Sequence, residues 1–256
     1  MTVQVVGPWS RPKLDEPDTT NDDAARFVPG PQNTPRRRWR RRRVRGTPWR
    51  VAIADGASTS FLARQWAELV ADAAVAGPID EVGDRLEATR PTWGAVLSDF
   101  REQRSLENQP LAWFEESKLS EGAAATLVMV EIDPVGRMAE VRCIGDAAAL
   151  LVRDGKLLDA VPTTDAEAFD NHPTLVRTVQ SVPTPISATW DLVRGDRVIV
   201  ASDGLAAWLL ARAAEGPLET WLDDLTDEQR FADLTERERR NQRMADDDVT
   251  CIVVEA

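Results

Sequence analysis

The spacing of hydrophobic and polar residues changes period several times along the chain. Short apolar runs bounded by turn residues predict early strands over residues 3–6, 22–28 and 49–54. From Phe61 the apolar positions recur at helical spacing up to Gly77-Pro78, which predicts an amphipathic helix. Further helical pieces follow, and Leu111–Phe114 is expected to continue the same helical layer.

After Gly122 the pattern becomes strand-like. It predicts strands over residues 125–132, 138–144, 147–153, 156–161, 175–179, 186–192 and 197–201. Helices are then predicted over 204–212, 217–222 and 227–243, and a buried strand over 249–255. Because strands and helices do not alternate, we expect an α+β fold with packed antiparallel sheets flanked by helices, forming one domain over residues 1–256.

Composition narrows the class of protein. The 256 residues are 43% hydrophobic, which suits a large globular domain and excludes wholesale disorder. No apolar run approaches the ~20 residues of a membrane span, and the first twenty residues do not resemble a secretory signal, so a cytoplasmic location is expected. Cys143 and Cys251 lie in apolar runs and are expected in the core, while His172 is the only histidine, which excludes a histidine-rich metal site.

Charge is unevenly distributed. The net charge is −12, yet eight arginines lie between Arg36 and Arg45, which leaves −20 for the rest of the chain. A generic nucleic-acid-binding protein would be basic overall, so this function is not expected. An acidic body fits a protein that gathers cations, although acidic surfaces also serve solubility alone.

Several aspartates stand at the ends of predicted strands. Asp55 and Asp203 follow apolar strands, and Asp246–Asp248 precede the last one. Carboxylates held at strand ends and converging in space form an oxygen-rich site for Mg²⁺ or Mn²⁺. Each aspartate alone also has a plain structural explanation, as a turn residue, a helix cap or part of a solvated loop.

Taken in order, six segments resemble the motifs of one family. They are TNDDAARF, VAIADGAS, GAAATLVMVEI, RCIGDAAALLVRDGKL, DRVIVASDGLAAWLL and DDDVTCIVV. Together they resemble the type 2C (metal-dependent, PPM-type) serine/threonine protein phosphatases from about residue 20 to the end, most closely the bacterial single-domain members. The resemblance implies a four-layer α/β/β/α sandwich. It also implies hydrolysis of phosphoserine and phosphothreonine in proteins by a hydroxide bridging two Mn²⁺ or Mg²⁺ ions.

The same resemblance assigns roles to individual residues. The catalytic residues it implies are Asp55, Asp203 and Asp247. The metal ligands it implies are Asp23, Asp55, Gly56 through its carbonyl, Asp203 and Asp247, with Asp22 and Asp146 as weaker candidates. Asp146 matches the ligand of a third ion in the family.

The chain departs from the family pattern in three places. Many members carry a phosphate-binding arginine shortly before the Asn-Asp-Asp motif, where this chain has Asp18-Thr19-Thr20. Ala57 stands where eukaryotic members often have histidine, and Ala207 replaces the usual partner of Asp146, which argues against a third ion. These departures leave open an alternative, a weak or inactive pseudophosphatase that acts as a regulatory docking module.

The arginine-rich segment, a loop or hairpin at about 29–48, has three possible roles. One arginine could replace the missing phosphate-binding residue, because its planar fork matches phosphate oxygens. Alternatively, Arg36–Arg45 forms a solvated basic hairpin or docks an acidic partner. The partners that the resemblance implies are phosphorylated proteins and a serine/threonine kinase whose action the protein opposes. A membrane is not expected, and nucleic acid, the other ligand that an arginine patch could dock, is disfavoured by the acidic body.

Overall fold

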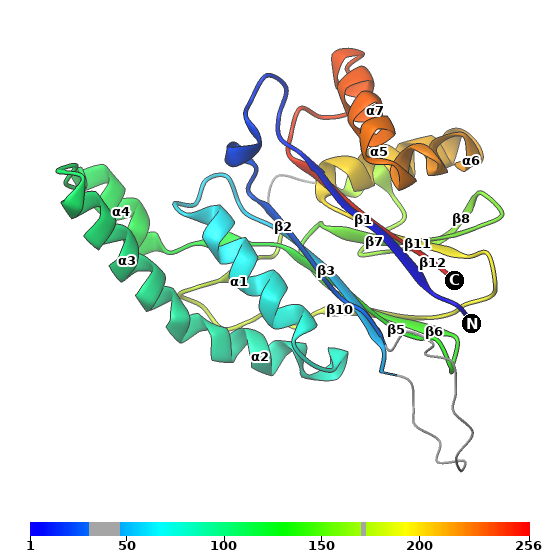
Figure 1. Ribbon diagram of the computed structural model, residues 1–256, viewed down its shortest axis with the longest axis horizontal. Coiled ribbons are helices and arrows are strands. Elements are labelled where there is room, and N and C mark those ends of the chain that lie inside the picture. The colour runs from blue at the N-terminus through cyan, green and yellow to red at the C-terminus, as the bar shows by residue number, and fades with distance from the viewer. Residues whose placement is uncertain (31–46, 170–172) are drawn as a thin grey trace, which may run out of the picture.

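Two five-stranded antiparallel sheets pack face to face in the computed structural model, which describes residues 1–30, 47–169 and 173–256 (Figure 1). The first sheet has the order β1 (Gln4–Arg11), β12 (Val249–Glu255), β11 (Arg197–Ala201), β7 (Ala148–Arg153) and β8 (Lys156–Val161). The second has the order β10 (Ile186–Asp191), β6 (Met138–Ile144), β5 (Leu127–Asp133), β3 (Trp49–Asp55) and β2 (Asp23–Val28). The short strands β4 (Ala124–Ala125) and β9 (Val176–Arg177) pair with each other.

Helices cover the outer face of each sheet (Figure 1). On the side of the second sheet lie α1 (Ala63–Val75), which packs on β2 and β3, and then α2 (Val82–Thr89), α3 (Trp93–Leu106) and α4 (Trp113–Glu121). The first sheet carries α5 (Asp203–Glu215), α6 (Glu219–Leu222) and α7 (Glu228–Arg240). Short 3₁₀ helices are η1 (Asp18–Thr20), η2 (Ile79–Glu81), η3 (Arg90–Thr92), η4 (Ala166–Ala168) and η5 (Asp224–Thr226). The expected α/β/β/α order of layers is therefore confirmed.

The two-residue period of the strands produces three buried layers. In β3, Val51 and Ile53 pack between the sheets, while Ala52 and Ala54 face α1. In β12, Ile252 and Val254 likewise point into the space between the sheets, and their neighbours face α5. Since both faces of these strands are covered, their sequences are nearly continuous apolar runs rather than alternating ones.

The first strand is longer than the sequence pattern predicts. The prediction ended at residue 6 because Gly7 and Pro8 are typical strand breakers, whereas β1 continues to Arg11. The register of β1 against β12 shifts between Val6 and Trp9, so the irregularity accommodates both residues within the strand. The continuation carries the chain to the end of the sandwich where the predicted site residues lie.

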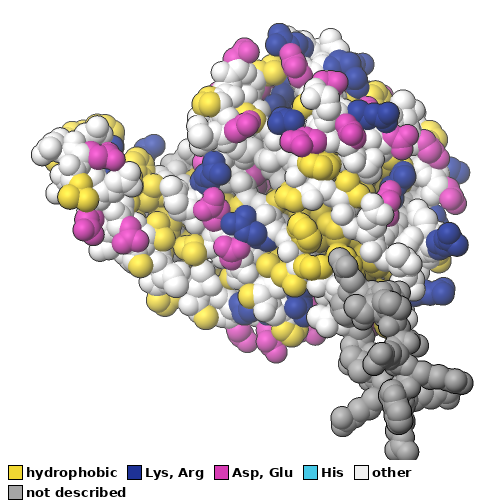
Figure 2. Space-filling model, in the orientation of Figure 1, with side chains coloured by type: hydrophobic (Ala, Val, Ile, Leu, Met, Phe, Trp, Pro, Cys, Tyr) yellow, Lys and Arg dark blue, Asp and Glu magenta, His cyan; other side chains and the backbone are white. Residues whose placement is uncertain are grey.

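Helices α3 and α4 form an arm, residues 93–121, that projects beyond the sheet (Figure 1). Trp93 is buried at its base, but Leu106, Trp113 and Phe114 are 77%, 83% and 54% exposed. Hydrophobic side chains are accordingly visible on this projecting part (Figure 2). The expected helical continuation at Leu111–Phe114 is found from Trp113, where α4 begins, but the exposure of Trp113 and Phe114 shows that this part of the helical layer does not pack on the sheet.

Two features discussed from the sequence lie outside the described residues. These are the arginine run Arg36–Arg45 and His172. None of the helices in the described ranges combines the length and the apolar character that crossing a bilayer requires. Cys143 and Cys251 are buried, as expected.

Candidate metal centre

The pairing of β2 with β3 brings two predicted ligands together. Asp23 lies directly opposite Asp55 in the antiparallel register. Side chains of directly opposed residues project from the same face of a sheet, so the two carboxyl groups are neighbours. Gly56 follows at the strand end, and a Cβ there would come within 2.9 Å of the backbone oxygens of Asp22 and Ala63. Only glycine allows the chain to approach so closely.

The first sheet supplies the remaining predicted ligands. Ser202 and Thr250 join the end of β11 to the start of β12: the Ser202 amide donates to the Thr250 carbonyl at 3.1 Å, and the Thr250 amide donates to Ser202 Oγ at 2.9 Å. Asp203 begins α5 immediately after this junction, and Asp248 stands immediately before β12. The Asp22 amide donates to Asp248 Oδ2 at 2.8 Å, which ties the two sheets together at this point.

These residues form what we call the acidic centre, namely Asp22, Asp23, Asp55, Asp203, Asp247 and Asp248. Burial raises the pKa of Asp55 well above its usual value, and the charges of Asp23, Asp203, Asp247 and Asp146 raise it further. Burial, with the charges of Asp248 and Asp203, raises the pKa of Asp23 to about 7. The predicted ligands Asp23, Asp203, Asp247 and Asp146 therefore all lie within electrostatic reach of Asp55, whereas Asp22 interacts with Asp248.

The pKa values of Asp22, Asp203 and Asp248 are also raised. Burial is the main reason that the pKa of Asp203 is raised, and the charge of Asp247 adds to it. Burial also raises the pKa of Asp22 and that of Asp248. Because these carboxylates are buried close together, a bound cation would stabilise their ionised forms.

Within the described residues, no three acidic, histidine or cysteine side chains are already arranged as a set of metal ligands. The residues nevertheless fit a divalent cation. Both carboxylate oxygens of Asp23 and Asp248 Oδ1 are buried without a hydrogen-bond partner among the described residues. Unpartnered buried oxygens are costly unless a ligand satisfies them, and oxygen donors of this kind suit Mg²⁺ or Mn²⁺.

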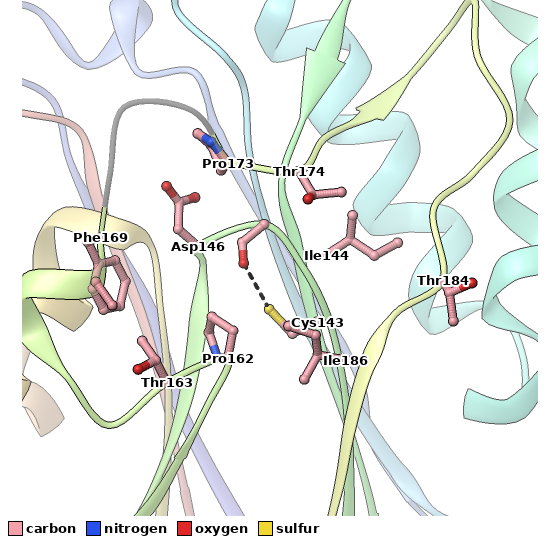
Figure 3. A pocket seen from close by; sticks show the side chains of 12 residues that line it. Cys143, Ile144, Asp146, Pro162, Thr163, Phe169, Pro173, Thr174, Thr184 and Ile186 are labelled. Atoms are coloured by element: carbon pink, nitrogen blue, oxygen red, sulfur yellow. Dashed lines mark hydrogen bonds between the residues drawn. The ribbon is translucent and has the colours of Figure 1, made fainter.

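A pocket of about 270 Å³ lies beside the acidic centre, at the turn after β6 (Figure 3). Asp146 lines it, and the charge of Asp146 contributes to the raised pKa of Asp55, the predicted bridging ligand. Much of the rest of the lining is apolar and includes Ile144, Phe169 and Ile186. Cys143 also borders the pocket, but burial raises its thiol pKa, so it is not poised as a nucleophile.

Two basic residues at the acidic centre were not identified from the sequence. Lys13 Nζ lies 3.1 Å from Asp247 Oδ1. Arg239 is buried, and its guanidinium donates to the carbonyls of Pro12 and Asp247. Lys13 stands nine positions before Asp22 and Arg239 lies on α7, so neither belongs to a local motif that could have marked it.

The comparisons with known proteins agree with this architecture. The sequence profile described as "Protein phosphatase 2C" matches residues 38–249. No curated protein matches the chain in sequence. The likeness to solved structures extends over whole chains at low sequence identity.

Three of these structures illustrate the likeness. The catalytic domain of the serine/threonine protein phosphatase PstP, solved with two manganese ions, is 18% identical with a TM-score of 0.57, covering 99% of this chain and 97% of that one. The S. agalactiae serine/threonine phosphatase is 18% identical with a TM-score of 0.60, covering 100% of both chains. A bacterial serine phosphatase is 12% identical with a TM-score of 0.62, covering 100% of this chain and 97% of that one. The match of the family profile over most of the sequence, together with this fold, shows that the chain belongs to the protein phosphatase 2C family.

Proposed function

We propose that the protein hydrolyses phosphoserine and phosphothreonine in other proteins, with two Mn²⁺ or Mg²⁺ ions held at the acidic centre. The observation that carries this proposal is the pairing of Asp23 with Asp55, together with the two buried carboxylate oxygens of Asp23 that have no hydrogen-bond partner among the described residues. In such a site, divalent cations supply an activated water and offset the negative charge of a phosphate group. Membership of the phosphatase family supports the same reaction.

Each predicted metal ligand has a distinct role in this proposal. Asp55 would bridge the two ions with the Gly56 carbonyl as a further ligand, and Asp203 and Asp247 would complete the second site. Asp23 would hold the first ion through waters and is a stronger candidate for this role than Asp22. Asp146 faces the pocket beside the centre, and we propose no third ion there because Ala207 offers no ligand.

The carboxylates also set the charge that a substrate meets. A phosphate dianion is repelled by a bare cluster of aspartates, so the acidic centre admits substrate only when cations offset it. The pairing of β2 with β3 holds Asp23 and Asp55 in fixed positions, which reduces the rearrangement needed when a cation binds.

The decisive experiment measures hydrolysis of a phosphothreonine peptide by the purified protein, with Mn²⁺ and with EDTA. Asp55→Asn is the test variant, and Asp191→Asn, which alters an exposed aspartate of β10, is the matched control. We expect Mn²⁺-dependent turnover in the wild type and the control, and at least a hundredfold loss in Asp55→Asn. Folded wild-type protein without turnover in Mn²⁺ would instead support the alternative, a pseudophosphatase that acts by docking.

A partner kinase, cytoplasmic location and docking of an acidic partner by Arg36–Arg45 belong to this proposal as well. If an arginine of that segment holds the substrate phosphate, replacing Arg36–Arg43 with glutamine will raise KM for the peptide. An unchanged KM would leave docking, or a solvated segment without a binding role, as the alternatives.

A further inference from the structure

Lys13 lies at the acidic centre without being part of any motif. Its ammonium group is 3.1 Å from Asp247 Oδ1, and its side chain is 33% exposed. Burial raises the pKa values of Asp22, Asp203 and Asp248, and the positive charge of Lys13 offsets part of this rise. A single ammonium thus acts as counter-ion to four carboxylates from both sheets.

The backbone around Lys13 is anchored on both sides. Arg239 donates to the Pro12 carbonyl at 2.6 Å, and the Leu14 amide donates to Asp246 Oδ1 at 2.8 Å. These contacts fix the turn after β1 against α7 and the segment before β12. The flexible part of Lys13 is therefore its side chain, whose four methylene groups allow the ammonium to change partners without movement of the turn.

Asp247 pairs with Lys13 in this structure and would bind a divalent cation in the proposed function. The ammonium and the cation compete for the same carboxylate. In this structure Asp247 Oδ1 accepts from Lys13 and from the Asp248 amide. In the proposed function the same carboxylate is a ligand of a divalent cation. A cation that takes Asp247 releases the ammonium and repels it, while a phosphate group entering the site offers it new acceptor oxygens.

We propose that Lys13 is an exchanging counter-ion, which pairs with Asp247 in the metal-free protein and binds the substrate phosphate once a divalent cation occupies Asp247. This inference rests on the proposed function. It gives the chain a phosphate-binding cation at a position different from Asp18–Thr20, where no arginine is present. Lys13 is a substrate-binding residue that holds phosphate in the ground state and in the transition state alike.

The test compares Lys13→Met, Lys13→Arg and the control Lys118→Met in the full chain. Lys118 is exposed on α4, in the arm and away from the acidic centre. Titration with Mn²⁺ in the absence of phosphate should show severalfold tighter binding by Lys13→Met, because the competing ammonium is gone. In saturating Mn²⁺, inorganic phosphate should bind this variant about tenfold more weakly, since a charge-assisted hydrogen bond is lost.

The kinetic signature follows from the same reasoning. KM for the phosphothreonine peptide should rise about tenfold in Lys13→Met with kcat changed less than twofold, and Lys13→Arg should restore phosphate binding. Phosphate affinity equal to that of the wild type, or weaker Mn²⁺ binding in Lys13→Met, would overturn the role of Lys13. A wild-type protein that binds no Mn²⁺ and shows no turnover would overturn the proposed function together with it, so the two failures are distinguishable.

Discussion

Replacing Asp23 with asparagine should stabilise the metal-free protein while abolishing its activation by metal. Burial and neighbouring charges raise the pKa of Asp23 from 3.8 to about 7. The folded state therefore holds the proton of Asp23 more tightly than the unfolded state. The contribution of this group to stability is greatest below about pH 4, declines as the pH rises towards 7, and is lost above 7.

The size of the effect follows from that pKa. One pKa unit corresponds to 1.36 kcal/mol, so ionised Asp23 costs about 4 kcal/mol at pH 8 relative to its protonated form. Asparagine keeps the shape of the side chain and removes the charge. Because its amide must also find partners in a buried position, we expect a gain of about half this amount, about 2 kcal/mol in the free energy of unfolding.

The assay is urea denaturation followed by tryptophan fluorescence, in EDTA, at pH 5 and pH 8. Asp23→Asn should be more stable than the wild type at pH 8, with a smaller difference at pH 5, and the control Asp191→Asn should show neither change. In saturating Mn²⁺ the order should reverse, since a ligand at a hundred times its Kd adds about 2.7 kcal/mol to the wild type. A loss of stability in EDTA at pH 8, or a gain that does not depend on pH, would refute this reasoning.

Three further outcomes are expected. Asp203→Asn should abolish Mn²⁺-dependent turnover of a phosphothreonine peptide while its circular dichroism stays unchanged; retained turnover would show that the ligand assignment is wrong. Asp196→Asn should destabilise the protein by about 1–2 kcal/mol at pH 7 in urea denaturation, because the buried Asp196 carboxylate accepts two charge-assisted hydrogen bonds from Arg153, at 2.7 and 2.8 Å. Trp113→Ser and Phe114→Ser should each change the free energy of unfolding by less than about 0.5 kcal/mol, since both side chains are exposed; a larger loss would mean that the arm packs on the body.

Much of the fold was predictable because its signals are local. The strand β3 and the helix α1 follow from an apolar run and from a helical period, each contained within a few turns of chain. The aspartates at strand ends were visible for the same reason, and six short motifs in order indicated the family. Patterns of this kind depend only on residues close together in the sequence.

What covers a helix, or what lies opposite a strand residue, is not local. Trp113 has the same apolar character as Trp93, yet Trp93 is buried and Trp113 projects on the arm. The extent of β1 depends on pairing with β12, which lies more than 230 residues away. Burial and register are properties of partners that the segment itself does not contain.

The sequence by itself determined the order of elements, the layered fold and the set of candidate carboxylates. Only the tertiary structure decided that Asp23 stands opposite Asp55 and that Lys13 pairs with Asp247. The physical reason is that a carboxylate's pKa and its counter-ion depend on distances and burial, which arise when the two sheets meet. The pKa values and ion pairs of the acidic centre therefore depend on the packing of the two sheets, although each of its aspartates can be found in the sequence.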